Sequence, residues 1–107
     1  MPLRQSQPQS AGPAIDEERL IARADYFLGL ADIAGARRFL ERALAKGSAR
    51  AAFVLAQTYD AEFLQSLQTV GVRADTDKAR QFYQAAAAAG IEQAKARLQA
   101  LNLIERR

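Results

Sequence analysis

The sequence predicts an all-α chain built from two similar helical units. Residues 31–55 return as residues 74–98, at an offset of 43 positions. A repeat period of 20–50 residues is typical of stacked supersecondary units, each of which buries its apolar face only against a neighbour. Strand signals are missing, because the sequence holds no Asn-Gly or Asp-Gly turn and no run that alternates apolar and polar residues. The identical pairs are Ala31/Ala74, Asp32/Asp75, Ala36/Ala79, Arg37/Arg80, Phe39/Phe82, Ala43/Ala86, Ala45/Ala88, Gly47/Gly90, Ala51/Ala94 and Leu55/Leu98.

Composition restricts the function classes. A chain of 107 residues provides one domain with one elongated core. The net charge is only +3, and arginines alternate with acidic residues along the helices, which indicates a solvated surface more than an anion-binding one. The chain has no cysteine and no histidine, so thiol nucleophiles, soft-metal ligands and histidine bases are excluded within it.

The N-terminal segment differs from the rest of the chain. Residues 1–14 combine Pro, Gln, Ser and Gly with few large aliphatic residues, which predicts a disordered tail or linker. If this segment is the end of a longer tether, the chain is the C-terminal module of a larger protein. No stretch resembles a signal sequence, and no apolar run reaches the ~20 residues of a membrane span. We therefore expect a soluble chain, cytoplasmic by default and periplasmic if a signal precedes it.

The first unit is predicted to be a pair of helices. Asp16, Glu17 and Glu18 place negative charge in a first helical turn, and the stripe that follows extends to about Leu30. Asp32 is then positioned as the N-cap of a second helix, which ends at a left-handed Gly47. The apolar stripes consist of Leu20, Ile21, Ala24, Phe27 and Leu28 in the first helix and Ile33, Ala36, Phe39, Leu40, Ala43 and Leu44 in the second.

The second unit is predicted to contain an insertion. Ser48 is placed to cap a helix that reaches Tyr59. Asp60 is placed to cap a short extra helix, which the loop over residues 71–74 follows. The next helix starts at Asp75 or Thr76 and stops at Gly90. A final helix over about residues 91–101 has one polar face, as a capping helix requires. The repeat domain is predicted over residues 15–103, and residues 104–107 should fray.

The second unit resembles a Sel1-like repeat. It reads Ala51-x-x-x-Leu55-Ala56-x-x-Tyr59, then Gly71-Val72-x-x-Asp75-x-x-Lys78-Ala79-x-x-Phe82-Tyr83-x-x-Ala86-Ala87-x-x-Gly90-x-x-x-Ala94-x-x-x-Leu98. Two features depart from the family pattern: Ala56 replaces the usual glycine, and the connection from Tyr59 to Gly71 is long. The first unit resembles the related tetratricopeptide type, in which Ala24, Phe27, Ile33, Ala36, Leu40 and Ala43 match the spacing. The register of its first helix stays open, because Ala24 and Leu28 also align with Ala51 and Leu55.

The resemblance covers residues 20–101 and implies a short right-handed α-solenoid of two antiparallel helix pairs plus a terminal capping helix. It also implies a scaffold or adaptor without catalytic activity. Such a module needs no cofactor, metal or small-molecule substrate, and its partner would be another protein or peptide.

Residues that could carry chemistry have simpler explanations. Asp75 and Asp77 could form a carboxylate metal pair, but no third ligand is near, so helix capping accounts for them. The acids at 16–18 could be catalytic, yet they complement a helix dipole. Tyr59, Phe82 and Tyr83 could stack on nucleic-acid bases, but the repeat pattern places them in the core.

The predicted partner-binding surface consists of positions on the first helix of each pair: Asp25, Arg50, Phe53 and Gln57. An exposed Phe53 among polar groups would suit a peptide anchor, whereas the insertion could instead cover it, and both interpretations remain open. The alternative function is a basic-surface binder of nucleic acid or another anionic partner. A steep fall of affinity with salt would favour that alternative, because phosphate contacts release counterions.

Overall fold

The protein is all-helical over the residues that the structure describes. The computed structural model describes the backbone of residues 2–105 and the side chains of residues 15–104, and no strand occurs within that backbone. The helices, in chain order, are α1 (Pro2–Gly29), α2 (Ile33–Ala45), α3 (Ala49–Tyr59), α4 (Ala61–Ser66), α5 (Thr76–Ala88) and α6 (Glu92–Glu105). The all-α prediction is therefore confirmed.

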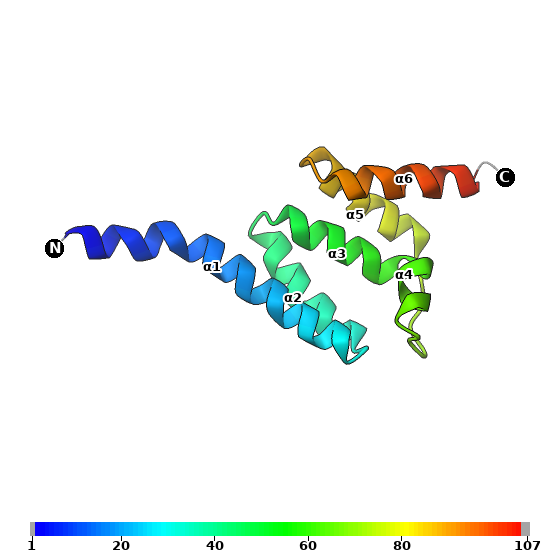
Figure 1. Cartoon of the computed structure of the whole chain (residues 1–107), viewed down its shortest axis with the longest axis horizontal. Helices are drawn as coiled ribbons and strands as arrows, with labels where there is room; N and C mark the ends of the chain where they lie inside the picture. Colours follow the sequence, from blue (N-terminus) through cyan, green and yellow to red (C-terminus); the bar gives the residue numbers. More distant parts are fainter. Residues whose placement is uncertain (1, 106–107) are drawn as a thin grey trace.

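The helices pack in sequence order. α1 packs on α2, α2 on α3, α3 on α5, and α5 on α6, while the short α4 lies against the end of α3 (Figure 1). α1 and α6 therefore lie at opposite ends of the row. Two core clusters result, one shared by α1, α2 and α3 and the other by α3, α5 and α6.

Helix α3 belongs to both clusters because its two apolar sides face different neighbours. Ala51 and Leu55 are buried in the first cluster, whereas Ala52 and Ala56 are buried in the second. Small side chains let helices approach closely, so α3 can be covered on both sides. Ala56, the residue that departs from the Sel1-like pattern, is completely buried there.

The predicted helix starts are confirmed. Asp32, Ser48, Asp60 and Asp75 are the N-caps of α2, α3, α4 and α5, and the side chain of each accepts a hydrogen bond from a backbone N–H in the first turn. Such a cap satisfies one of the N–H groups that a helix leaves without an internal partner. The insertion between Tyr59 and Asp75 therefore begins with a short helix, as predicted.

The predicted helix ends at the two repeated glycines are also confirmed. Gly47 and Gly90 have φ of 91° and 98°. The N–H of the residue that follows each glycine donates to the carbonyl five positions earlier, from Ser48 to Ala43 and from Ile91 to Ala86. This is the Schellman arrangement, which needs a left-handed residue that glycine adopts without strain.

The two ends of the chain differ from the predicted boundaries. α1 begins at Pro2, whereas a tail or linker is predicted over residues 1–14, and Figure 1 shows this part of α1 extending beyond the packed helices. The linker role stays a prediction, because the side chains of residues 1–14 lie outside the described part. α6 continues to Glu105, past the predicted end at residue 101, because Leu101 is buried in the core and no Gly or Pro follows it. Of the stretch predicted to fray, residues 106–107 lie outside the description.

Candidate functional site

The predicted partner-binding residues of α3 share one side of that helix. Arg50, Phe53 and Gln57 are spaced by three and four positions, which aligns them along α3. Arg50 is exposed, while Phe53 and Gln57 are half-buried. The ring of Phe53 lies 5.8 Å from the ring of Tyr83 on α5, measured between centroids. Phe53 therefore contributes to the second core cluster, which leaves only part of its ring for a ligand.

Asp25, the fourth predicted residue, lies on a different helix. Its side chain is exposed on α1. The binding role of all four residues stays a prediction.

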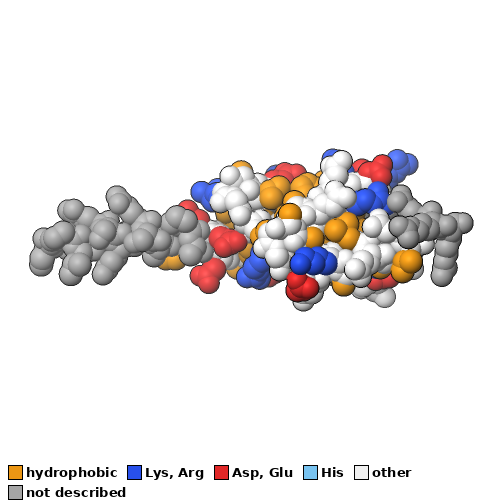
Figure 2. Space-filling model, turned by 90° about the horizontal axis from the view of Figure 1, so that it is seen from above, with side chains coloured by type: hydrophobic (Ala, Val, Ile, Leu, Met, Phe, Trp, Pro, Cys, Tyr) orange, Lys and Arg blue, Asp and Glu red, His pale blue; other side chains and the backbone are white. Residues whose placement is uncertain are grey.

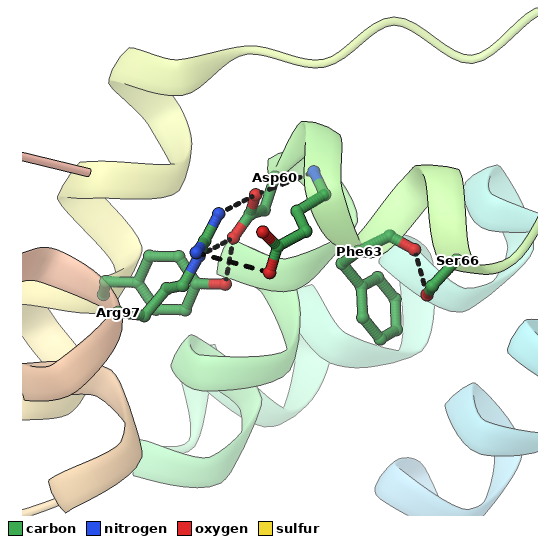
Figure 3. Close-up of polar contacts among 6 residues, drawn as sticks. Asp60, Phe63, Ser66 and Arg97 are labelled. Carbon is green, nitrogen blue, oxygen red and sulfur yellow. Dashed lines mark hydrogen bonds and ion pairs between the residues drawn. The ribbon is translucent and has the colours of Figure 1, made fainter. Parts of the chain in front are cut away.

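A polar cluster that sequence reasoning missed joins three parts of the fold. Figure 3 shows Arg97 of α6 and Asp60, at the junction of α3 and α4, pointing toward each other. Arg97 donates from Nε to Oδ2 of Asp60 at 2.6 Å and from Nη2 to Oδ1 at 3.0 Å. The Tyr83 hydroxyl donates to Oδ2 at 2.7 Å, and the Glu62 N–H donates to Oδ1 at 3.1 Å. One carboxylate thus accepts four hydrogen bonds.

The electrostatics of this cluster hold Asp60 in its charged form. The Asp60 side chain is only 3% exposed, and burial alone would raise its pKa. The hydrogen bonds from Arg97 and Tyr83 outweigh burial, so the pKa of Asp60 is lowered from 3.8. Burial and the bond to Asp60 raise the pKa of the Tyr83 hydroxyl, and the bond to Asp60 raises the pKa of Arg97. Each group is therefore fixed in one protonation state, which suits a structural role and not proton transfer.

A second missed cluster surrounds Tyr59. The Arg37 guanidinium lies 3.8 Å from the centroid of the Tyr59 ring, and Lys78 Nζ lies 5.2 Å from it. Arg37 also donates from Nε to the buried Thr58 hydroxyl at 3.1 Å. Phe82 stacks on Tyr59 with centroids 5.9 Å apart. Tyr59 and Phe82 are thus packed between helices, as predicted, and are not a free platform for bases.

A cavity lies between α1 and α2. Its volume is about 840 Å³, and the described residues that line it all belong to these two helices. Phe39 at its floor stacks on Phe27 with centroids 5.5 Å apart, and Tyr26 at its rim is 63% exposed. The lining residues are Arg19, Leu20, Ala22, Arg23, Tyr26, Phe39 and Arg42.

Among the described residues no group of three or more metal-ligating side chains comes together. The helices described also include none that combines the length and the apolar character needed to cross a membrane. Figure 2 shows basic and acidic side chains interspersed over the face seen there, as the charge pattern of the sequence predicts.

The repeated sequence contains one signal of the Asp60 cluster. At the offset of 43 residues, Tyr83 corresponds to Leu40 and Arg97 to Val54. Polar residues therefore stand in residues 74–98 where the matching stretch, residues 31–55, has apolar ones, and Asp60 precedes both polar residues in the chain. This substitution pattern indicates a polar contact specific to the second unit, although it does not identify the acceptor.

Comparisons with protein-family models, with curated proteins and with solved structures found no match to this chain. The resemblance to Sel1-like repeats accordingly depends on the residues of the sequence alone.

Proposed function

We propose that this chain is a non-catalytic protein-interaction module, a scaffold or adaptor built as a short right-handed α-solenoid of Sel1-like and tetratricopeptide-like repeats. Its partner is another protein or peptide, and docking occurs on the side of α3 that carries Arg50 and Gln57, with Asp25 of α1 contributing charge. Phe53 forms the partly covered floor of this surface.

The observation that carries the proposal is the equivalence of the two units. Residues 43 positions apart have the same structural role: Asp32 and Asp75 are N-caps, and Gly47 and Gly90 are left-handed C′ residues. Three of the five matched alanine pairs are fully buried: Ala36/Ala79, Ala43/Ala86 and Ala51/Ala94. Repeated units that pack only on their neighbours produce extended surfaces, and such surfaces are suited to binding other chains.

A site-specific photo-crosslinking experiment tests this proposal. A benzophenone amino acid replaces Gln57 on α3 or, as the control, the exposed Gln84 on α5, and each labelled chain is irradiated in extract of its source cells. We expect a discrete protein adduct from position 57 and none from position 84. Arg50→Glu should remove the adduct, whereas Arg38→Glu, an equal charge change at an exposed position of α2, should retain it.

Circular dichroism must show equal helicity for all variants, since each changed side chain other than Gln57 is exposed. Equal labelling from positions 57 and 84, or recovery of nucleic acid alone with binding lost at moderate salt, would contradict the scaffold function.

A further inference from the structure

The groove between α1 and α2 has an apolar floor and a basic rim. Leu20 and Phe39 form the floor, and three arginines surround it: Arg19 and Arg23 on α1 and Arg42 on α2. Within the described residues none of the three has a carboxylate partner. Arg23 lies over the Phe39 ring at 5.9 Å from its centroid, which orders its guanidinium beside the floor without neutralising it.

Among the described residues, only those of α1 and α2 line this groove. α3 packs on the other side of α2, so α1 and α2 form the end of the helix row (Figure 1). The N-terminal part of α1 continues in line with the rest of that helix and does not fold back toward α2 (Figure 1). An outer face of a repeat array is usually polar, yet this one exposes the Tyr26 ring beside a cavity of about 840 Å³.

We propose that this groove binds an acidic amphipathic helix of a partner protein. A helix can pack between two antiparallel helices through its apolar side chains, as α3 does where Ala51 and Leu55 join the cluster shared with α1 and α2. Arg19 and Arg23 are one helical turn apart, so two carboxylates one turn apart on the ligand match their spacing. Arg42 reaches the same ligand from the other wall.

The occupant is a protein helix and not a nucleic acid because of what surrounds the arginines. Glu18 and Asp25 on α1 and Glu41 on α2 are exposed on the same helices without lining the groove. They would repel a long phosphate backbone, whereas a single helix contacts only the groove. The apolar floor also needs an apolar side chain, which a nucleic-acid backbone does not offer. This second docking surface goes beyond the proposed function and does not depend on the α3 surface.

The probe for the test is a fluorescent, alanine-based helical peptide of about 18 residues. It carries two glutamates four positions apart and a leucine one position before the second glutamate. Fluorescence anisotropy follows its binding to the full chain. We expect saturable binding that weakens on the order of tenfold for Arg19→Glu or Arg42→Glu, because reversing a charge opposite a carboxylate replaces attraction with repulsion. Tyr26→Ala should weaken binding less, and Arg50→Glu on α3 should have no effect.

Control ligands identify the occupant. Replacing both glutamates with glutamine, or the leucine with alanine, should weaken binding of the peptide to the unchanged chain. The proposal is overturned if the glutamine peptide binds equally well or if Arg50→Glu weakens binding as much as Arg19→Glu. It is also overturned if no binding saturates, or if a uridine oligonucleotide binds more tightly than the peptide and is sensitive to the same arginines. Arg50→Glu tests the α3 surface and not the groove. The groove proposal can therefore fail while the scaffold proposal stands, and the scaffold proposal can fail while the groove proposal stands.

Discussion

The two copies of the repeated stretch form similar helices, but different contacts stabilise them. In the first copy of the repeated stretch, residues 31–55, Leu40 fills a core position with an aliphatic side chain, and Val54 packs at the edge of the same cluster. In the second copy, residues 74–98, Tyr83 and Arg97 occupy the corresponding positions and both bind the buried Asp60. The same packing site therefore accepts an apolar or a polar residue, provided that the polar one finds a partner. At these positions, the stability of the second copy therefore depends on individual hydrogen bonds, whereas that of the first copy depends on buried apolar area.

Removing Asp60 tests this difference most directly. Asp60→Ala should destabilise the fold by about 3 kcal/mol, because Tyr83 and Arg97 lose their acceptor while α4 loses its cap. Asp75→Ala is the matched control, since Asp75 caps α5 through the Lys78 N–H but is exposed; it should cost about 1 kcal/mol. Urea unfolding of the three proteins measures both values. Equal losses would show that the Asp60 cluster adds nothing beyond a helix cap.

Overfilling the equivalent alanines should affect the units alike. Ala43 and Ala86 are both fully buried, and each carbonyl accepts the bond that closes its helix end. Ala43→Leu and Ala86→Leu should each cost roughly 1–3 kcal/mol, because a close-packed helix contact has no room for the larger side chain. Thermal unfolding checks this prediction. If one variant melts like the unchanged protein, the two positions are not equivalent in packing.

Acid should weaken the Asp60 cluster selectively. The folded-state pKa of Asp60 is lowered below 3.8, so its charge contributes stability above that value, and the contribution disappears as the pH falls through the folded pKa. Asp60→Asn has no such titration. We therefore expect the stability difference between the unchanged protein and Asp60→Asn to be constant from pH 7 to about 5 and to shrink below about 4. Urea titrations across this range measure the difference, and a constant gap down to pH 2 would contradict a charged Asp60.

The smallest effect concerns the helix ends. Ala31 closes α1 with φ of 58°, the role that Gly47 and Gly90 have elsewhere. An alanine in the left-handed region destabilises the fold by about 1–2 kcal/mol. Glycine removes this strain, but its greater flexibility in the unfolded chain offsets roughly half of the gain. Ala31→Gly should therefore raise stability by about 0.5–1 kcal/mol, while Gly47→Ala should lower it by a similar amount. Differential scanning calorimetry resolves both signs. A loss of stability in Ala31→Gly would show that the turn is not strained.

Local features were largely predictable from the sequence. The caps at Asp32, Ser48, Asp60 and Asp75 and the stops at Gly47 and Gly90 follow from residue types with one strong backbone preference. Ala31 was not identified as a left-handed residue, because alanine has no such preference and the need for one comes from packing α1 on α2.

Contacts between distant residues were not predictable in the same way. Asp60 was identified as a cap, but its bonds to Tyr83 and Arg97 join residues 23 and 37 positions apart. No helical spacing encodes such a contact. The same reason explains why the three arginines of the α1–α2 groove were overlooked and why the contact of Phe53 with Tyr83 of α5 was not predicted.

The position of Arg97 affects how the molecule opens locally. α6 packs on α5, yet its arginine passes to the junction of α3 and α4, where the Asp60 carboxylate also holds Tyr83 and the first turn of α4. When α6 lifts away, the same event loosens groups on α4 and α5. Amide protons of α6 and of the start of α4 should therefore exchange with solvent in one concerted step, while those of α2 remain protected. The Arg97 guanidinium thus couples the hydrogen exchange of segments that are far apart in the chain.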